Sequence, residues 1–166
     1  MRFVTVPACS RTVWPSRAGL IPAAFLIAGL AGCTTPESPS TGLGSAPAAY
    51  AAEDFVGRWG LASYHRDTDR VRTETLARQQ CGNPYVIKRG PNGGLMMHVA
   101  DDPELRELQL KGSTGGQTFI GPDGPPGDTF DREVTAFDGK ILTTRWVDPE
   151  VAARYGTMVL VRCGTA

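Results

Sequence analysis

The chain has 166 residues, a length that fits one domain of ordinary size, and its 17 basic residues balance its 17 acidic ones. Charges of both signs are interspersed without a basic block. This disfavours nucleic-acid binding, which needs a concentrated positive surface. The four cysteines form neither a CxxC redox motif nor a zinc-ligand cluster, so neither function is indicated.

An apolar segment near the N-terminus has the order of residues found in secretory signals. Arg2, Arg11 and Arg17 precede the segment, which runs over the 15 residues 18–32. It is shorter than the roughly 20 residues of a membrane-spanning helix. We expect it to be cleaved; the alternative is an uncleaved membrane anchor.

The segment ends in Leu30-Ala31-Gly32-Cys33. This tetrapeptide resembles the lipobox of bacterial lipoproteins. The resemblance implies transfer of diacylglycerol to the Cys33 thiol, cleavage before Cys33 and acylation of the new N-terminus by a fatty acid such as palmitate. Thr34 is similar to the residue that follows the cysteine in outer-membrane lipoproteins. We therefore expect a lipid anchor in the outer membrane and a domain in the periplasm.

These features divide the chain into a signal peptide (1–32), a lipidated cysteine with a flexible tether (33–53) and a folded domain (54–166). The tether is rich in Pro, Ser, Thr, Gly and Ala and has too few apolar residues to offset the entropy cost of ordering. Cleavage would remove three basic residues and no acidic ones, which leaves the mature chain with a net charge of −3.

The two cysteines of the predicted domain, Cys81 and Cys163, would lie in an oxidising compartment. We predict a disulfide between them. Closing a loop of this length stabilises a fold by about 4.5 kcal/mol in the chain-entropy description. The alternative is two separate buried thiols.

Apolar alternation and turn residues predict a strand over 55–64, a helix over 67–80 and then a succession of short strands. The helix should end at the Cys-Gly-Asn-Pro run 81–84. Further strands are expected over 85–89, 95–99, 106–111, 117–120, 130–137, 141–147 and 157–163, with a helical turn over 149–155. About eight short strands predict a mainly β domain, a small antiparallel up-and-down barrel with one short helix after the first strand.

Gly57-Arg58-Trp59 on the first strand and Arg162 on the last resemble the pattern of lipocalins and other calycins. In that pattern an arginine lies over the tryptophan and closes one end of the barrel, a contact that contributes about 0.5–2 kcal/mol. Small barrels of the bacterial metalloprotease-inhibitor family also open on a similar strand and have one disulfide. The alternative is that Trp59 is an ordinary core residue and Arg162 a surface charge.

Catalytic and metal sites are not indicated, and we predict a protein that is not an enzyme and has no cofactor. His65 and His98 are the only histidines, and neither is surrounded by a nucleophile motif. The acidic residues lack the spacing of a calcium loop and are typical of turns. They are Asp101, Asp102, Glu104, Asp123, Asp128 and Asp131.

An eight-stranded barrel has room for side chains or for one small ligand. We expect the interior to be filled, with Met96, Met97, Met158, Trp146, Phe130 and Phe137 as the candidates. The leading functional hypothesis is a binding or inhibitory module for an envelope protein, such as a protease or a cell-wall enzyme. The resemblance to the inhibitor family implies that residues 49–55 would enter the cleft of the target. The alternatives are a lipocalin-like carrier of a small apolar ligand and a structural lipoprotein without a ligand.

Overall fold

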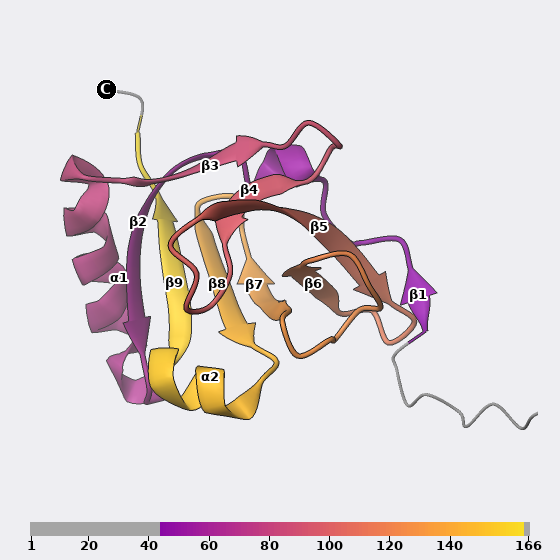
Figure 1. The fold of residues 1–166 in the computed structure, drawn as a ribbon. Coiled ribbons are helices and arrows are strands. Elements are labelled where there is room, and N and C mark those ends of the chain that lie inside the picture. Colours follow the sequence, from indigo (N-terminus) through magenta and orange to yellow (C-terminus); the bar gives the residue numbers. More distant parts are fainter. Residues whose placement is uncertain (1–43, 165–166) are drawn as a thin grey trace, which may run out of the picture. The chain divides into compact units, whose positions relative to one another are not determined.

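The computed structural model describes residues 44–164, which form a closed antiparallel barrel of eight strands (Figure 1). Its strands are β2 (Gly57–Tyr64), β3 (Tyr85–Arg89), β4 (Leu95–His98), β5 (Leu105–Ser113), β6 (Thr118–Gly121), β7 (Arg132–Phe137), β8 (Ile141–Trp146) and β9 (Thr157–Arg162). Each strand pairs with the next along the chain, and β9 returns to pair with β2. The predicted small up-and-down barrel is confirmed.

The predicted helix is also present. A 3-10 turn (Asp67–Asp69), helix α1 (Arg70–Gln79) and a second 3-10 turn (Gln80–Gly82) connect β2 to β3. Helix α1 lies against the outer side of β2 and β9 (Figure 1). The contact is close because Gly60 of β2 has no side chain: a Cβ there would lie 1.9 Å from the Ala77 carbonyl oxygen. The predicted turn over 149–155 is the short helix α2 (Pro149–Tyr155), which the Asp148 carboxylate caps.

The folded domain begins before the predicted boundary at Asp54. Strand β1 (Ser45–Ala46) pairs with the end of β5, and the Ala49 N–H donates to the Thr118 hydroxyl at 3.1 Å. A 3-10 turn (Ala52–Asp54) follows. The last part of the predicted tether is therefore packed on the barrel. Cys33, the signal peptide and the rest of the tether lie outside the described residues.

The core occupies the barrel interior and includes a group of aromatic rings at one end. Its buried members are Phe55, Trp59, Ile87, Leu95, Met97, Leu108, Ile120, Val134, Leu142 and Leu160. The rings of Tyr50, Phe55 and Phe137 contact one another with centroids 4.9–5.7 Å apart. We call this the closed end of the barrel, and the opposite end, which has α2 and the β4–β5 and β6–β7 loops, the open end.

One predicted interior residue is on the surface. Phe130 is 67 % exposed in the β6–β7 loop. The next residue, Asp131, is fully buried and forms an ion pair with Lys111 of β5 at 2.6 Å. The buried Asp131 carboxylate also accepts from the N–H groups of Gly127 and Asp128, which anchors the loop from inside and leaves Phe130, in the turn before it, on the surface. The prediction for Phe130 is wrong for that reason.

Residues 44–164 contain a closed barrel, its core and a disulfide, which are the features of an independently folding domain. Across this part of the chain, the helices are too short or too polar to cross a bilayer.

Candidate functional site

The closed end is built around Trp59 and Arg162, which are directly paired between β2 and β9. The Arg162 guanidinium lies 4.2 Å from the centroid of the Trp59 ring, a cation–π contact. The indole Nε1 donates to the carbonyl of Phe55 at 2.8 Å. The contact that the lipocalin-like pattern implied is therefore present, and it joins the first barrel strand to the last.

Arg162 also connects the segment before β2 to the β7–β8 turn through hydrogen bonds to three backbone carbonyls. These belong to Asp54, Val56 and Gly139. Gly57 makes room for this arrangement: a Cβ there would lie 2.8 Å from the Arg162 Nη1, and its φ of 147° suits glycine. The local structure thus explains why a glycine and a tryptophan stand at positions 57 and 59.

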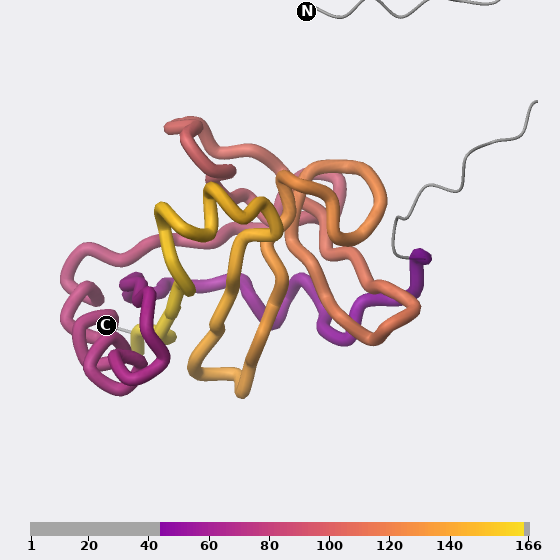
Figure 2. The backbone as a smooth tube through the Cα atoms, turned by 90° about the horizontal axis from the view of Figure 1, so that it is seen from below, coloured from indigo at the N-terminus to yellow at the C-terminus, as the bar shows by residue number. Residues whose placement is uncertain are grey.

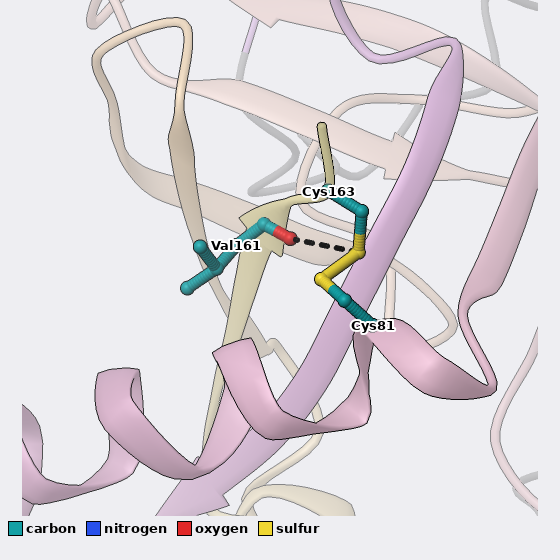
Figure 3. Close-up of a disulfide and its surroundings, with 3 residues drawn as sticks. All are labelled: Cys81, Val161 and Cys163. Atoms are coloured by element: carbon teal, nitrogen blue, oxygen red, sulfur yellow. Dashed lines mark hydrogen bonds between the residues drawn. A yellow bond between two sulfur atoms is a disulfide. The ribbon is translucent and has the colours of Figure 1, made fainter. Parts of the chain in front are cut away.

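The predicted disulfide between Cys81 and Cys163 is present (Figure 3). It joins the 3-10 turn after α1 to the residue that follows β9. The Cys163 N–H also donates to the Arg58 carbonyl at 2.9 Å, which keeps the chain beside β2 after the strand has ended. The closed end is therefore fastened by both covalent and polar contacts, which suits a structural role.

The open end contains a cavity of about 430 Å³. Figure 2 shows the backbone of the molecule from the side on which α2 lies. Most of the cavity lining is apolar or aromatic, from six strands, the β4–β5 loop and the end of α2. The lining residues are Leu61, Tyr85, His98, Val99, Ala100, Asp101, Asp102, Pro103, Arg132, Trp146, Tyr155, Met158 and Leu160. The expectation that side chains fill the whole interior is therefore wrong at this end.

The reason for the cavity is visible in the strand pairing. Strands β3 and β4 pair only at Lys88↔Met96 and Arg89↔Leu95, towards the closed end. Beyond these pairs, the Tyr85 hydroxyl takes the place of a backbone partner and accepts a hydrogen bond from the His98 N–H at 3.0 Å. The barrel wall is thus completed by a side chain, and space is left beside it.

The cavity has few polar groups, and they differ in how many hydrogen bonds they form. The His98 Nδ1 lies 3.3 Å from the Tyr85 hydroxyl. Arg132 is 4 % exposed, and its guanidinium lies 4.2 Å from the centroid of the Trp146 ring. Burial lowers the pKa of Arg132 to about 10, so it stays protonated at neutral pH. The site combines an apolar lining with one buried cation, as small-molecule pockets often do.

The rim of the cavity is held by the β4–β5 loop and α2. Asp101 adopts a φ of 60°, uncommon for a residue other than glycine, and accepts hydrogen bonds from Arg154 at 2.7 Å and from the Tyr155 hydroxyl at 2.6 Å. The hydrogen bond to Asp101 raises the pKa of Tyr155. At Asp102, the Glu104 N–H and then the Arg106 side chain lower the carboxyl pKa. These contacts fix the loop over the mouth of the cavity.

Two of the remaining acidic candidates, Asp128 and Asp131, accept hydrogen bonds within the β6–β7 loop. Asp128 accepts from the Thr129 hydroxyl at 3.0 Å, and Asp131 accepts from the N–H groups of Gly127 and Asp128. In residues 44–164 the acidic, histidine and cysteine side chains form no group of three or more suited to a metal ion. His65 is exposed beyond the end of β2 and does not line the cavity.

Sequence reasoning missed Arg132 and Tyr85. Neither stands in a motif, and the polar pattern of β7 and β3 does not separate them from surface residues. Only the closure of the barrel brings Arg132, Tyr85 and His98 to one cavity.

In comparisons with known proteins, no family model, no curated protein and no solved structure matched this chain. The function is therefore inferred from the site itself.

Proposed function

We propose that the protein is a non-catalytic binding lipoprotein of the bacterial outer membrane. In this proposal Cys33 carries the lipid, the domain faces the periplasm, and the open-end cavity holds a small apolar ligand. The observation that carries the ligand-binding part is the cavity of about 430 Å³, because ligand pockets are typically concave, mainly apolar and about 300–1,000 Å³ in volume.

The two ends of the barrel support a division of roles. At the closed end, side chains and the disulfide fix the structure, and Phe55 and Trp59 are fully buried. At the open end, Val99 and Met158 line a space and are only partly buried. A rigid frame with one unfilled apolar end favours binding by a preformed site, which loses little conformational entropy.

A neutral apolar dye tests this function. Nile red should gain fluorescence on binding to the domain, residues 34–166. Val99→Trp places a large side chain at the cavity from the β4–β5 loop and should lower the affinity for the dye at least about tenfold. A tenfold loss corresponds to about two fewer methylene-sized groups of the dye being buried. The matched control is Val71→Trp on the exposed face of α1, where the side chain is 76 % exposed. Equal dye binding by the two variants, or none by the unmodified domain, would contradict the proposal.

A second candidate is binding or inhibition of an envelope protease or cell-wall enzyme. The exposed Phe130, beside the open end, favours a protein contact because large aromatic residues are enriched at interfaces. Residues 49–55 are instead packed on the barrel, where Tyr50 contacts Phe55 and Phe137. An inhibitory mode through 49–55 would therefore have to displace these rings. Removal of all residues before Phe55 tests this mode. Inhibition that is unchanged in the shortened chain would exclude it.

A further inference from the structure

Arg132, the first residue of β7, is a buried cation with an unsatisfied donor. Its Nη2 donates to the His98 carbonyl and its plane lies near Trp146, its cross-strand partner. The Nε–H is buried and has no hydrogen-bond partner in the described residues. Trp146 is a lining residue of the same cavity, and its buried indole Nε1 is likewise without a partner among these residues. Buried donors are normally paired, so the surroundings of Arg132 are unusual for a purely structural residue.

The charge of Arg132 is also uncompensated. Across residues 44–164, Arg132 takes part in no ion pair. Two carboxylates, Asp101 and Asp102, line the cavity, but each is already engaged by other groups. The partners are Arg154 and Tyr155 for Asp101, and Arg106 and the Glu104 N–H for Asp102. The cavity lining therefore has one positive charge without a counter-charge.

The other buried cation of the described residues, Lys111, has contacts that Arg132 lacks. Lys111 is 9 % exposed and lies 2.6 Å from the fully buried Asp131. Its Nζ also donates to the carbonyls of Pro122 and Pro125 at 2.9 and 3.1 Å. A structural buried cation in this fold is thus paired and hydrogen-bonded, as physical chemistry requires. Arg132 differs in bordering a cavity.

We propose that the open-end cavity selects an apolar ligand with a single carboxylate, which pairs with the Arg132 guanidinium while its apolar body lies against Leu61, Met158 and Leu160. This inference rests on the proposed function. One negative charge matches the one positive charge of the lining that has no ion-pair partner in residues 44–164. A phosphate monoester carries about −1.5 to −2 charges at neutral pH, and the excess would lie near Asp101 and Asp102.

A second donor is available at the same place. The Tyr85 hydroxyl already accepts from the His98 N–H, so its own proton is free for an acceptor. That acceptor is either the His98 Nδ1 at 3.3 Å or a carboxylate in the cavity. Arg132 and Tyr85 together would hold the carboxylate of the ligand. The apolar lining would contact its hydrocarbon part without selecting one particular hydrocarbon.

Three probes of equal chain length test the inference by isothermal titration at pH 7: decanoate, decanol and decyl phosphate. The domain should bind decanoate at least about tenfold more tightly than decanol, because a charged hydrogen-bonded pair replaces a buried unpaired cation. It should bind decyl phosphate no more tightly than decanoate. Arg132→Gln should remove the preference for decanoate, whereas the matched control Arg72→Gln, on the exposed face of α1, should keep it.

The outcomes separate the two proposals. If neither decanoate nor decanol binds, the proposed function fails and the inference fails with it. If both bind equally, the cavity binds apolar ligands but the carboxylate assignment is overturned. Tighter binding of decyl phosphate than of decanoate would also overturn it. The decanoate and decanol comparison uses the unmodified domain, so it decides the question even if Arg132→Gln does not fold.

Discussion

A single missing Cβ allows an arginine to close the barrel. At Gly57 the backbone φ is 147°, and Arg162 fills the space where a side chain would stand. From there the guanidinium reaches the Trp59 ring and three carbonyl oxygens of two chain segments. At residue scale, the absence of a side chain at Gly57 leaves the space that the Arg162 guanidinium occupies.

Substitution of this glycine tests that pairing. Gly57→Ala should lower the free energy of unfolding by about 2–4 kcal/mol, since it adds a clash with Arg162 to the cost of a positive φ. Gly116→Ala is the matched control: its φ is 82°, but a Cβ there would have no other atom within 4 Å. It should lose only about 1 kcal/mol. Urea unfolding measures both, and equal losses would show that the contact with Arg162 is unimportant.

At the scale of elements, the disulfide connects the helical insertion to the end of the barrel. Cys81 lies in the turn after α1, and Cys163 follows β9. Strand β9 is also held by backbone pairing on both sides, to β2 and β8. The barrel should therefore remain closed when the disulfide is reduced, because the sheet pairing does not depend on it.

Reduction should instead weaken the fold as a whole. Without the link across 82 residues, the unfolded chain regains entropy, and the free energy of unfolding should fall by about 4.5 kcal/mol. Urea unfolding of the domain with and without reductant measures this loss, and circular dichroism before the transition should show unchanged strand content. A collapse of that strand signal on reduction alone would contradict the account of the closed barrel.

At the scale of the molecule, the two ends of the barrel differ in packing. The closed end combines buried aromatic rings, the Trp59–Arg162 contact and the disulfide. The open end has a cavity whose mouth is bounded by the β4–β5 loop and α2, joined through Asp101. A stable frame at one end allows incomplete packing at the other, where ligand binding would restore the missing contacts.

The sequence predicts the first of these ends better than the second. Turn residues such as Asp138-Gly139 and the alternation around them specify strands locally, and the Trp59–Arg162 pattern and two remaining cysteines specify how the barrel closes. The cavity depends on residues from many elements and on a short β3–β4 pairing that no local pattern encodes. For the same reason, the sequence alone does not distinguish Arg132 from a surface arginine at the end of a strand.

The most direct test of a binding role is native mass spectrometry of the domain, residues 34–166, purified gently from periplasm with its disulfide intact. We predict a stoichiometric small-molecule adduct, formed either as purified or on addition of decanoate, which Val99→Trp abolishes and Val71→Trp preserves. A clean ligand-free mass in both conditions would contradict the claim that the open end of the barrel is a binding site.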